Sequence, residues 1–571
     1  MKKNLALFIL LCTSQILAST AELGQEYIER WKKFYPSEAL AMGIHSAIFD
    51  YEDRSAENIE SWLAFNKKMF QQLSTTTRPK NEENSIDIRL LNIQLKTEID
   101  KWEQEAPHQH SLSLYATLIA NAIAQLEKAT FLTHSEKKQL ALQRLAAVQN
   151  LCSAAIRVLE DGDRDDLENG LKRLAQTADF YRAGWQDLAG KWGIPATDKT
   201  FSEGGLATSR SIQALISHVT TAILPKAKAS NFILGREEYA RKLTLYTDSP
   251  LTPEQLAEMA LTEIEQVRKL IGEISLEYLK TAYPIRTVPK EEALIVQAAF
   301  ADMEKDAPKN GEEYLQFWQD LSEAAIQFIE THQIATLPQY QTLRILPAPE
   351  SAGPAARIGW VESAPPFAPN PLTSLYLPSI PDTFPEKERT EFWASFNKPF
   401  NRMIVIHELF PGHYMQIKIS RESPHPIRLF FPYSLYIEGW ATFTERVLLD
   451  AGWERENKLT LLAHLRKRLE NANRAYTSVQ VHCNGWDQEK VMAFSTETSL
   501  LAPQFAKSLW GRLMHSPMQM TSYFLGGQQF TDLFNTEKER HGTQFNLTDF
   551  MDTILRAGPI PIDEFSNLFK Q

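Results

Sequence analysis

The sequence predicts a mainly α-helical protein, with a large two-lobed helical body and a small strand and loop module beside a central cleft. Two observations lead to this prediction. Apolar residues recur every three or four positions through most of the 571-residue chain, as they do on amphipathic helices. Ten of the 30 prolines lie between Pro347 and Pro385, where they exclude a continuous helix. Because 43% of the residues are hydrophobic, the chain can bury a large core.

Residues 1–21 have the pattern of an export signal. Two lysines precede the apolar run Leu5 to Leu11, and small residues suited to cleavage follow at positions 18 and 19. The apolar run is too short for a membrane anchor, which takes roughly 20 residues. We therefore expect a periplasmic or secreted protein with no stable membrane insertion after cleavage. Cys12 raises the alternative of a lipid anchor, but a bulky leucine precedes it where a small residue is required.

The charge and cysteine content exclude several classes of protein. The net charge is −11 and the pI about 5.7, and no dense run of Lys or Arg suggests a nucleic-acid partner. After signal removal two cysteines remain, Cys152 and Cys483. One disulfide between them is possible, but there is neither a disulfide framework nor a CxxC metal pair. A metal site would need histidines and carboxylates. The sequence does not set the oligomeric state.

One continuous domain is expected over about 22–571, made of a helical half (22–336), the Pro-rich strand and loop module (337–385) and a second helical half (386–571). Within the first half, Thr252-Pro253-Glu254-Gln255 carries helix-start signals, an N-cap and a capping-box Gln, so a long helix should run to about Tyr278.

Within the module, Leu343 to Leu346 and Ser374 to Leu377 predict short strands. The second strand, with Tyr376, is either a cleft edge that pairs with a substrate backbone or a plain edge strand.

The segment from Asn401 to Lys418 combines an apolar helical pattern with His407, Glu408 and His413. Buried polar groups are costly unless they are paired or bind a metal, and imidazoles suit Zn²⁺. The usual zinc helix, HExxH, has its histidines four apart, whereas these are six apart and would lie about 120° apart around a straight helix. A two-residue bulge at Pro-Gly would bring the second imidazole back to the first. The alternative is two unrelated histidines on a kinked core helix.

Glu438 and Glu445 are seven residues apart on one face of an otherwise apolar predicted helix. Glu438 is suited to be a third zinc ligand, and Glu445 to orient a histidine ligand from behind. The alternatives are a buried ion pair between Glu438 and an arginine, and a surface location for Glu445.

The strings HELFPGHYMQ and YIEGWATFTE resemble the paired signatures of the DUF885 family of bacterial proteins, a family with gluzincin-like zinc metallopeptidase relatives. Weaker similarity extends over nearly the whole chain, from Ala39–His45 through the helix that starts at Thr252 to Arg474–His482, Pro517–Gly526 and Gly558–Pro561.

The resemblance implies a metallopeptidase body in which residues 386–571 form the zinc-binding catalytic half. His407, His413 and Glu438 would hold Zn²⁺, and Glu408 would activate a water molecule.

The expected reaction is hydrolysis of peptide bonds, with carboxypeptidase-like or dipeptidase-like action on short peptides. Tyr523 and His482 are candidate donors to the oxyanion, and Arg512 and Arg474 are candidates to bind a C-terminal carboxylate. Each has a structural alternative, as a satisfied core group or as a salt bridge. Two other functions stay open: a zinc hydrolase of esters or non-peptide amides, and a non-catalytic zinc-binding protein of the same fold.

Overall fold

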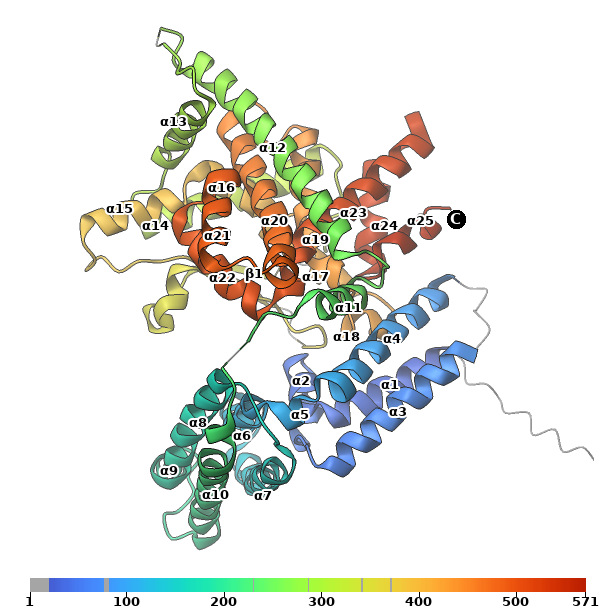
Figure 1. Ribbon diagram of the computed structural model, residues 1–571, viewed down its shortest axis with the longest axis vertical. Coiled ribbons are helices and arrows are strands. Elements are labelled where there is room, and N and C mark those ends of the chain that lie inside the picture. Colours follow the sequence, from blue (N-terminus) through green and yellow to red (C-terminus); the bar gives the residue numbers. More distant parts are fainter. Residues whose placement is uncertain are drawn as a thin grey trace, which may run out of the picture.

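The computed structural model describes residues 20–75, 82–229, 231–285, 287–339, 342–369 and 372–570. These residues form mostly helices, with one small sheet (Figure 1), so the predicted mainly α-helical class is confirmed. The predicted export signal, including Cys12, lies outside the described residues except for its last two positions. Within the described ranges, no helix combines the length and apolar character that crossing a membrane requires.

The N-terminal helices pack into an antiparallel group (blue in Figure 1): α1 (Thr20–Phe34), α3 (Ala56–Thr75) and α4 (Glu82–Asp100). Aromatic residues dominate its core, including Tyr27, Trp31 and Trp62. Phe430 and Phe431 from a segment nearly 400 residues later complete this core. The N-terminal helices are therefore joined to the half of the chain that carries the two histidines.

A second helical group has its own core (teal in Figure 1). It contains α6 (Leu112–Lys128), α7 (His134–Val158), α8 (Arg164–Asp179) and α10 (Lys199–His218). A capping box fixes the start of α7, where Thr133 and Glu136 satisfy each other's backbone N–H groups. Cys152 is a free thiol buried in this core.

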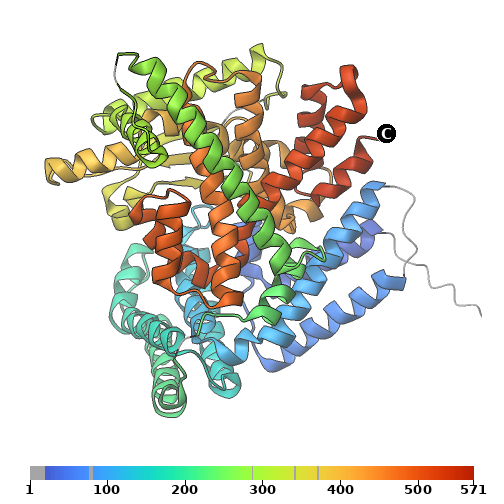
Figure 2. The ribbon, with the colours of Figure 1, turned by 45° about the horizontal axis from the view of Figure 1, so that its top comes forward.

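The third and largest group surrounds α20 (Lys458–Asn484). The long helix α12 (Pro253–Ala282) packs along α20 and crosses the front of this group in Figure 2. The Thr252 side chain accepts a hydrogen bond from the Gln255 N–H, which confirms the predicted capping box. Cys483 packs against this core as a free thiol, so no disulfide joins the two cysteines.

Four more helices build this group around the two-histidine segment: α14 (Gly311–Thr331), α16 (Lys398–Glu408), α19 (Ser434–Ala451) and α23 (Pro517–His541). The remaining α-helices are α2 (Pro36–Ala41), α5 (Pro107–His110), α9 (Trp185–Lys191), α11 (Arg236–Thr247), α13 (Glu292–Lys305), α15 (Glu386–Ser395), α17 (His413–Ser420), α18 (Pro426–Phe430), α21 (Gln488–Ala493), α22 (Pro503–His515), α24 (Leu547–Ala557) and α25 (Phe565–Leu568).

The Pro-rich module forms a three-stranded sheet of β1 (Leu343–Pro347), β2 (Trp360–Glu362) and β3 (Thr373–Leu377), in the order β1-β3-β2. Both predicted strands are present. However, β3 is the central strand, parallel to β1 and antiparallel to β2. The prediction that this strand offers a free edge is therefore wrong, because its backbone groups pair on both sides. Tyr376 stacks on the Trp360 ring, with centroids 4.6 Å apart.

Candidate metal centre

The two histidines lie on two helices rather than on one bulged helix. Helix α16 ends at Glu408, and α17 begins at His413. Between them the chain turns back on α16, and the Gly412 N–H donates to the Ile406 carbonyl at 3.0 Å. A side chain at Gly412 is excluded, because a Cβ there would lie 1.9 Å from the His407 carbonyl oxygen. The predicted continuous helix is therefore wrong, and glycine permits a tight return instead.

This turn brings the two imidazoles together. The ring centroids of His407 and His413 are 4.8 Å apart, and the rings are nearly perpendicular. Helix α19 supplies the third group: Oε2 of Glu438 lies 3.6 Å from His407 Nε2 and 3.4 Å from His413 Nε2. One ligand atom from each of the three residues lies within 4.8 Å of the others.

These distances fit a shared metal ion. Two zinc ligands at about 2.0–2.1 Å, placed at tetrahedral corners, are about 3.3–3.4 Å apart. Separations of 3.4 and 3.6 Å are too long for good hydrogen bonds. Oε2 of Glu438 is buried and has no hydrogen-bond partner among the described residues. Glu438 forms no ion pair with an arginine among the described residues, so that alternative is wrong. Three protein ligands would leave a fourth position open.

Glu445 lies behind the histidines, two turns after Glu438 on α19. Its side chain has no exposed surface, so the alternative of a surface acid is wrong. Oε1 accepts a hydrogen bond from His407 Nδ1 at 2.8 Å, which leaves His407 Nε2 facing Glu438. The other oxygen, Oε2, lies 3.1 Å from Nδ1 of His464. His464 comes from α20 and was not predicted, because no local pattern distinguishes it from a core histidine.

The carboxylates make the metal-free site electrostatically negative. Burial by itself lowers the pKa of His407, but Glu438 and Glu445 raise that pKa to about 10. Burial raises the pKa of Glu445, but hydrogen bonds from His407 and His464 bring it down to about 2. The pKa of Glu438 is likewise held well below its usual range by the two histidines against the opposing effect of burial. A dication that bound to His407 here would have to displace the proton on that ring.

Helices α19 and α23 touch through their backbones next to Glu438. A Cβ on Gly439 would lie 2.6 Å from the Gly526 Cα, so both positions need glycine. Tyr523, one turn before Gly526, is thereby brought close to Glu438. Burial raises the pKa of Tyr523, and the Glu438 carboxylate adds to the shift.

A second phenol, Tyr246 of α11, shares these surroundings. Burial, with the Glu438 carboxylate adding, raises its pKa to about 12, although a hydrogen bond with Ser522 opposes the shift. Tyr246 was not predicted, because it lies more than 160 residues before the two signature strings.

The two candidate arginines differ in their partners. Arg512 Nη2 donates to the Tyr523 hydroxyl at 3.3 Å, and its guanidinium has no ion-pair partner within the described chain. Arg474 is buried, bonds Asn471 at 3.1 Å and Glu470, and lies 4.6 Å above the Tyr523 ring. Arg474 therefore forms a structural salt bridge with Glu470, which was the alternative to substrate binding. Its guanidinium also packs on the Tyr523 ring.

His482 is unavailable as an oxyanion donor in this structure. Its Nδ1 accepts from the Leu234 N–H at 3.3 Å, and its Nε2 donates to the Leu513 carbonyl at 2.9 Å. Burial also lowers its pKa. The predicted role of His482 as an oxyanion donor is therefore not supported, because both of its ring nitrogens form hydrogen bonds with backbone groups. Glu408, by contrast, is half-buried at the end of α16, and its carboxylate accepts no hydrogen bond from a described residue.

The comparisons with known proteins place this chain in a family. The model of DUF885, a bacterial protein of unknown function, matches residues 36–567. The chain belongs to the DUF885 family. No curated protein matches it.

Two solved structures resemble this DUF885 protein. One, titled "a putative lipoprotein of unknown function" from Shewanella oneidensis, has a TM-score of 0.84 and 21% identity, over 97% of this chain and 100% of that one. The other, a "putative lipoprotein" from Colwellia psychrerythraea, has a TM-score of 0.71 and 17% identity, over 97% and 98%. At these identities the likeness shows a shared fold.

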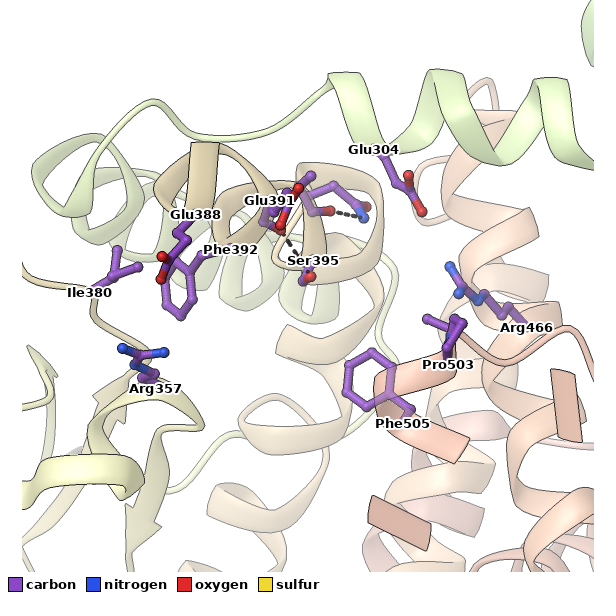
Figure 3. A pocket seen from close by; sticks show the side chains of 13 residues that line it. Glu304, Arg357, Ile380, Glu388, Glu391, Phe392, Ser395, Arg466, Pro503 and Phe505 are labelled. Carbon is purple, nitrogen blue, oxygen red and sulfur yellow. Dashed lines mark hydrogen bonds between the residues drawn. The ribbon is translucent and has the colours of Figure 1, made fainter. Parts of the chain in front are cut away.

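A separate cavity of about 560 Å³ opens between α13, α15, α20 and the start of α22. Figure 3 shows Arg357 and Arg466 entering it from opposite sides, with Phe392 and Phe505 between them. None of the three candidate metal ligands lines it. In this DUF885 protein the cavity is therefore distinct from the metal centre.

Proposed function

We propose that this DUF885 protein is a zinc-dependent hydrolase of peptide bonds. The observation that carries the proposal is the convergence of His407, His413 and Glu438. A zinc ion bound by these three ligands would keep a fourth position open for water or substrate. When bound there, Zn²⁺ would polarise a carbonyl group and lower the pKa of water. A two-lobed metallopeptidase body around a central cleft is part of this proposal.

Glu408 is the proposed general base. It follows the proposed ligand His407 directly, and its half-buried carboxylate has no competing hydrogen bond from a described residue. It would take a proton from the attacking water and pass it to the leaving amine. Positioned general bases of this kind contribute about 10²–10⁴-fold to rates.

Two phenols are the proposed donors to the oxyanion. Tyr523 and Tyr246 both lie near Glu438, and their raised pKa values keep them protonated at neutral pH. Preorganised donors of this kind stabilise the charge that develops on the carbonyl oxygen. Arg474 would serve Tyr523 by packing on its ring rather than by binding substrate.

The proposed substrates are short peptides with a free C-terminus. Arg512 lies next to the Tyr523 hydroxyl and has no carboxylate partner among the described residues. Guanidinium groups bind carboxylates through paired hydrogen bonds. This combination favours a carboxypeptidase-like or dipeptidase-like reaction. Tyr376 lies in the β-sheet module, and a substrate-contacting role for it stays part of the proposal.

We also propose that the protein is exported to the periplasm or beyond. The pattern of residues 1–21 supports this, and the titles of both structural relatives contain the words "putative lipoprotein". Cleavage without lipidation remains our expectation, because Leu11 precedes Cys12.

The test uses the protein without residues 1–21, loaded with zinc and incubated with a peptide library that contains free and amidated C-termini. Mass spectrometry should detect cleavage products, and elemental analysis should find about one zinc per chain. Glu408→Gln should retain zinc and lose cleavage. Zinc binding with no product from any peptide would reject the peptidase. Turnover of esters in place of peptides would favour the second candidate, a zinc hydrolase of esters or other amides. Absence of both would favour the non-catalytic alternative.

A further inference from the structure

We infer that His464 is a positioning residue of the metal centre, acting on the ligand His407 through Glu445. The inference rests on the metal site in the proposed function, and it adds a residue that neither the signature strings nor the family match assigns. Its basis is a chain of two hydrogen bonds across three helices.

The chain runs from α16 through α19 to α20. His407 Nδ1 donates to one oxygen of Glu445 at 2.8 Å, and His464 Nδ1 lies 3.1 Å from the other oxygen. The exposed fractions of the three side chains are 6%, 0% and 4% respectively. The carboxylate therefore depends on these two histidines as its hydrogen-bond donors among the described residues.

The physical role of His464 follows from this burial. A buried carboxylate is strongly disfavoured unless hydrogen bonds satisfy both of its oxygens. With one donor on each oxygen, Glu445 cannot rotate about its terminal bond without breaking a hydrogen bond. A fixed carboxylate in turn holds the His407 ring so that Nε2 faces Glu438 and His413. Without His464, one oxygen loses its partner and the restraint on His407 weakens.

A small cavity with several polar lining residues adjoins His464. Its volume is about 60 Å³, and Thr442, Asn471 and Tyr523 also line it. Thr442 Oγ1 and Asn471 Nδ2 are buried there without a hydrogen-bond partner in the described residues. A cavity of this size and polarity has room for water. Water in it could connect His464 with Tyr523, the proposed donor to the oxyanion.

The competing explanation is that His464 only stabilises the fold by neutralising a buried acid. Three substitutions separate the two roles. His464→Asn keeps a donor near the position of Nδ1, His464→Leu fills similar space without a donor, and His464→Ala removes both. His482→Asn is the matched control, because His482 is equally buried on the same helix and bonds only backbone groups.

The experiment measures the zinc dissociation constant of each folded variant by competition with a chromogenic chelator, together with its thermal unfolding. Outer partners of metal ligands change affinity by about 10–100-fold. We expect His464→Leu and His464→Ala to weaken zinc binding by about 10-fold, at the lower end of that range. His464→Asn should recover most of the loss, and His482→Asn should bind as the wild type does.

Wild-type affinity in His464→Leu or His464→Ala would overturn the inference, as would a loss that His464→Asn does not recover. If His464→Leu and His464→Ala are both unfolded while His464→Asn folds and binds zinc normally, His464 serves only the stability of the fold. That result would also overturn the inference. A wild-type protein that binds zinc but cleaves no peptide would reject only the proposed reaction. A wild-type protein that binds no zinc would overturn both.

Discussion

Oε2 of Glu438 lies 3.4 Å from Nε2 of His413, and these two groups come from helices that begin 21 residues apart in the chain. The separation is too long for a strong hydrogen bond and close to that of two ligands on one zinc ion. The carboxylate oxygen is buried without another partner.

Glu438→Gln should weaken zinc binding by more than about 100-fold, since a direct ligand matters more than an outer partner. The amide keeps the shape of the side chain but removes its negative charge. Chelator competition and elemental analysis would measure the change. Glu537→Gln, which alters a buried glutamate outside the candidate metal centre, is the control and should bind zinc normally. Equal zinc affinity in the two variants would contradict the ligand assignment.

Glu408→Gln should lower the turnover of a cleaved peptide by about 10²–10⁴-fold, because the general base is lost. Zinc content should stay at the wild-type level, since Glu408 is not a proposed ligand. The measurement is kcat on the best library peptide beside elemental analysis of the same sample. Full activity in this variant would remove Glu408 from the mechanism.

Gly439→Ala should force α19 and α23 apart, because the added Cβ would meet the Gly526 Cα at 2.6 Å. Overpacking of this kind costs about 1–3 kcal/mol, which urea unfolding would detect. Activity should fall as well, since the same contact sets Tyr523 against Glu438. Gly190→Ala in α9 is the control: nothing lies within 4 Å of its Cβ, so stability should stay equal or rise slightly. Equal effects at both positions would contradict the close packing.

Arg512→Ala should raise KM for peptides with a free C-terminus by roughly 10–100-fold, as expected for a lost hydrogen bond to a charged group. Amidated peptides should show little change, because they lack the carboxylate. Arg556→Ala alters an exposed arginine that pairs with Asp552 and should leave KM unchanged for both substrates. A similar loss on amidated peptides would show that Arg512 does not select the C-terminus.

The stability of the metal-free protein should depend on pH in two opposite directions. The pKa of His407 is raised to about 10, so its contribution is complete below the unfolded value near 6.5 and is lost as the pH rises toward 10. The pKa of Glu445 is lowered to about 2, so its contribution is complete above the unfolded value near 4.5 and is lost as the pH falls toward 2. Both contributions are therefore largest between about pH 4.5 and 6.5.

Urea unfolding of the chelator-treated protein from pH 3 to pH 10 would test this dependence. His407→Asn should lose the decline on the alkaline side, and zinc binding should tighten as the pH rises, because zinc replaces a proton on His407. If the free energy of unfolding of His407→Asn falls at alkaline pH as much as that of the wild type, the fall does not come from the raised pKa of His407.

Local sequence was sufficient for the features that depend on near neighbours. The capping box at Thr252 and the two strands of the Pro-rich module follow from residues within a few positions of each other, and both are present. The candidate ligands could also be chosen from the sequence, because few residue types bind zinc and these residues stand in otherwise apolar segments.

The features that depend on distant segments could not be read in this way. The central place of β3, the commitment of His482 to backbone groups and the contribution of Tyr246 arise where segments far apart in the chain pack together. The break between α16 and α17 is local, but the residue pattern alone did not show how closely Gly412 approaches the His407 carbonyl.

The sequence by itself thus determined the helical class, the family resemblance and the candidate ligands. Only the tertiary structure decided that Glu438 meets both histidines, that Glu445 is buried behind them and that His464 completes its hydrogen bonds. The physical reason is that spacing along the chain sets which residues share a helical face, whereas the packing of helices sets which faces meet.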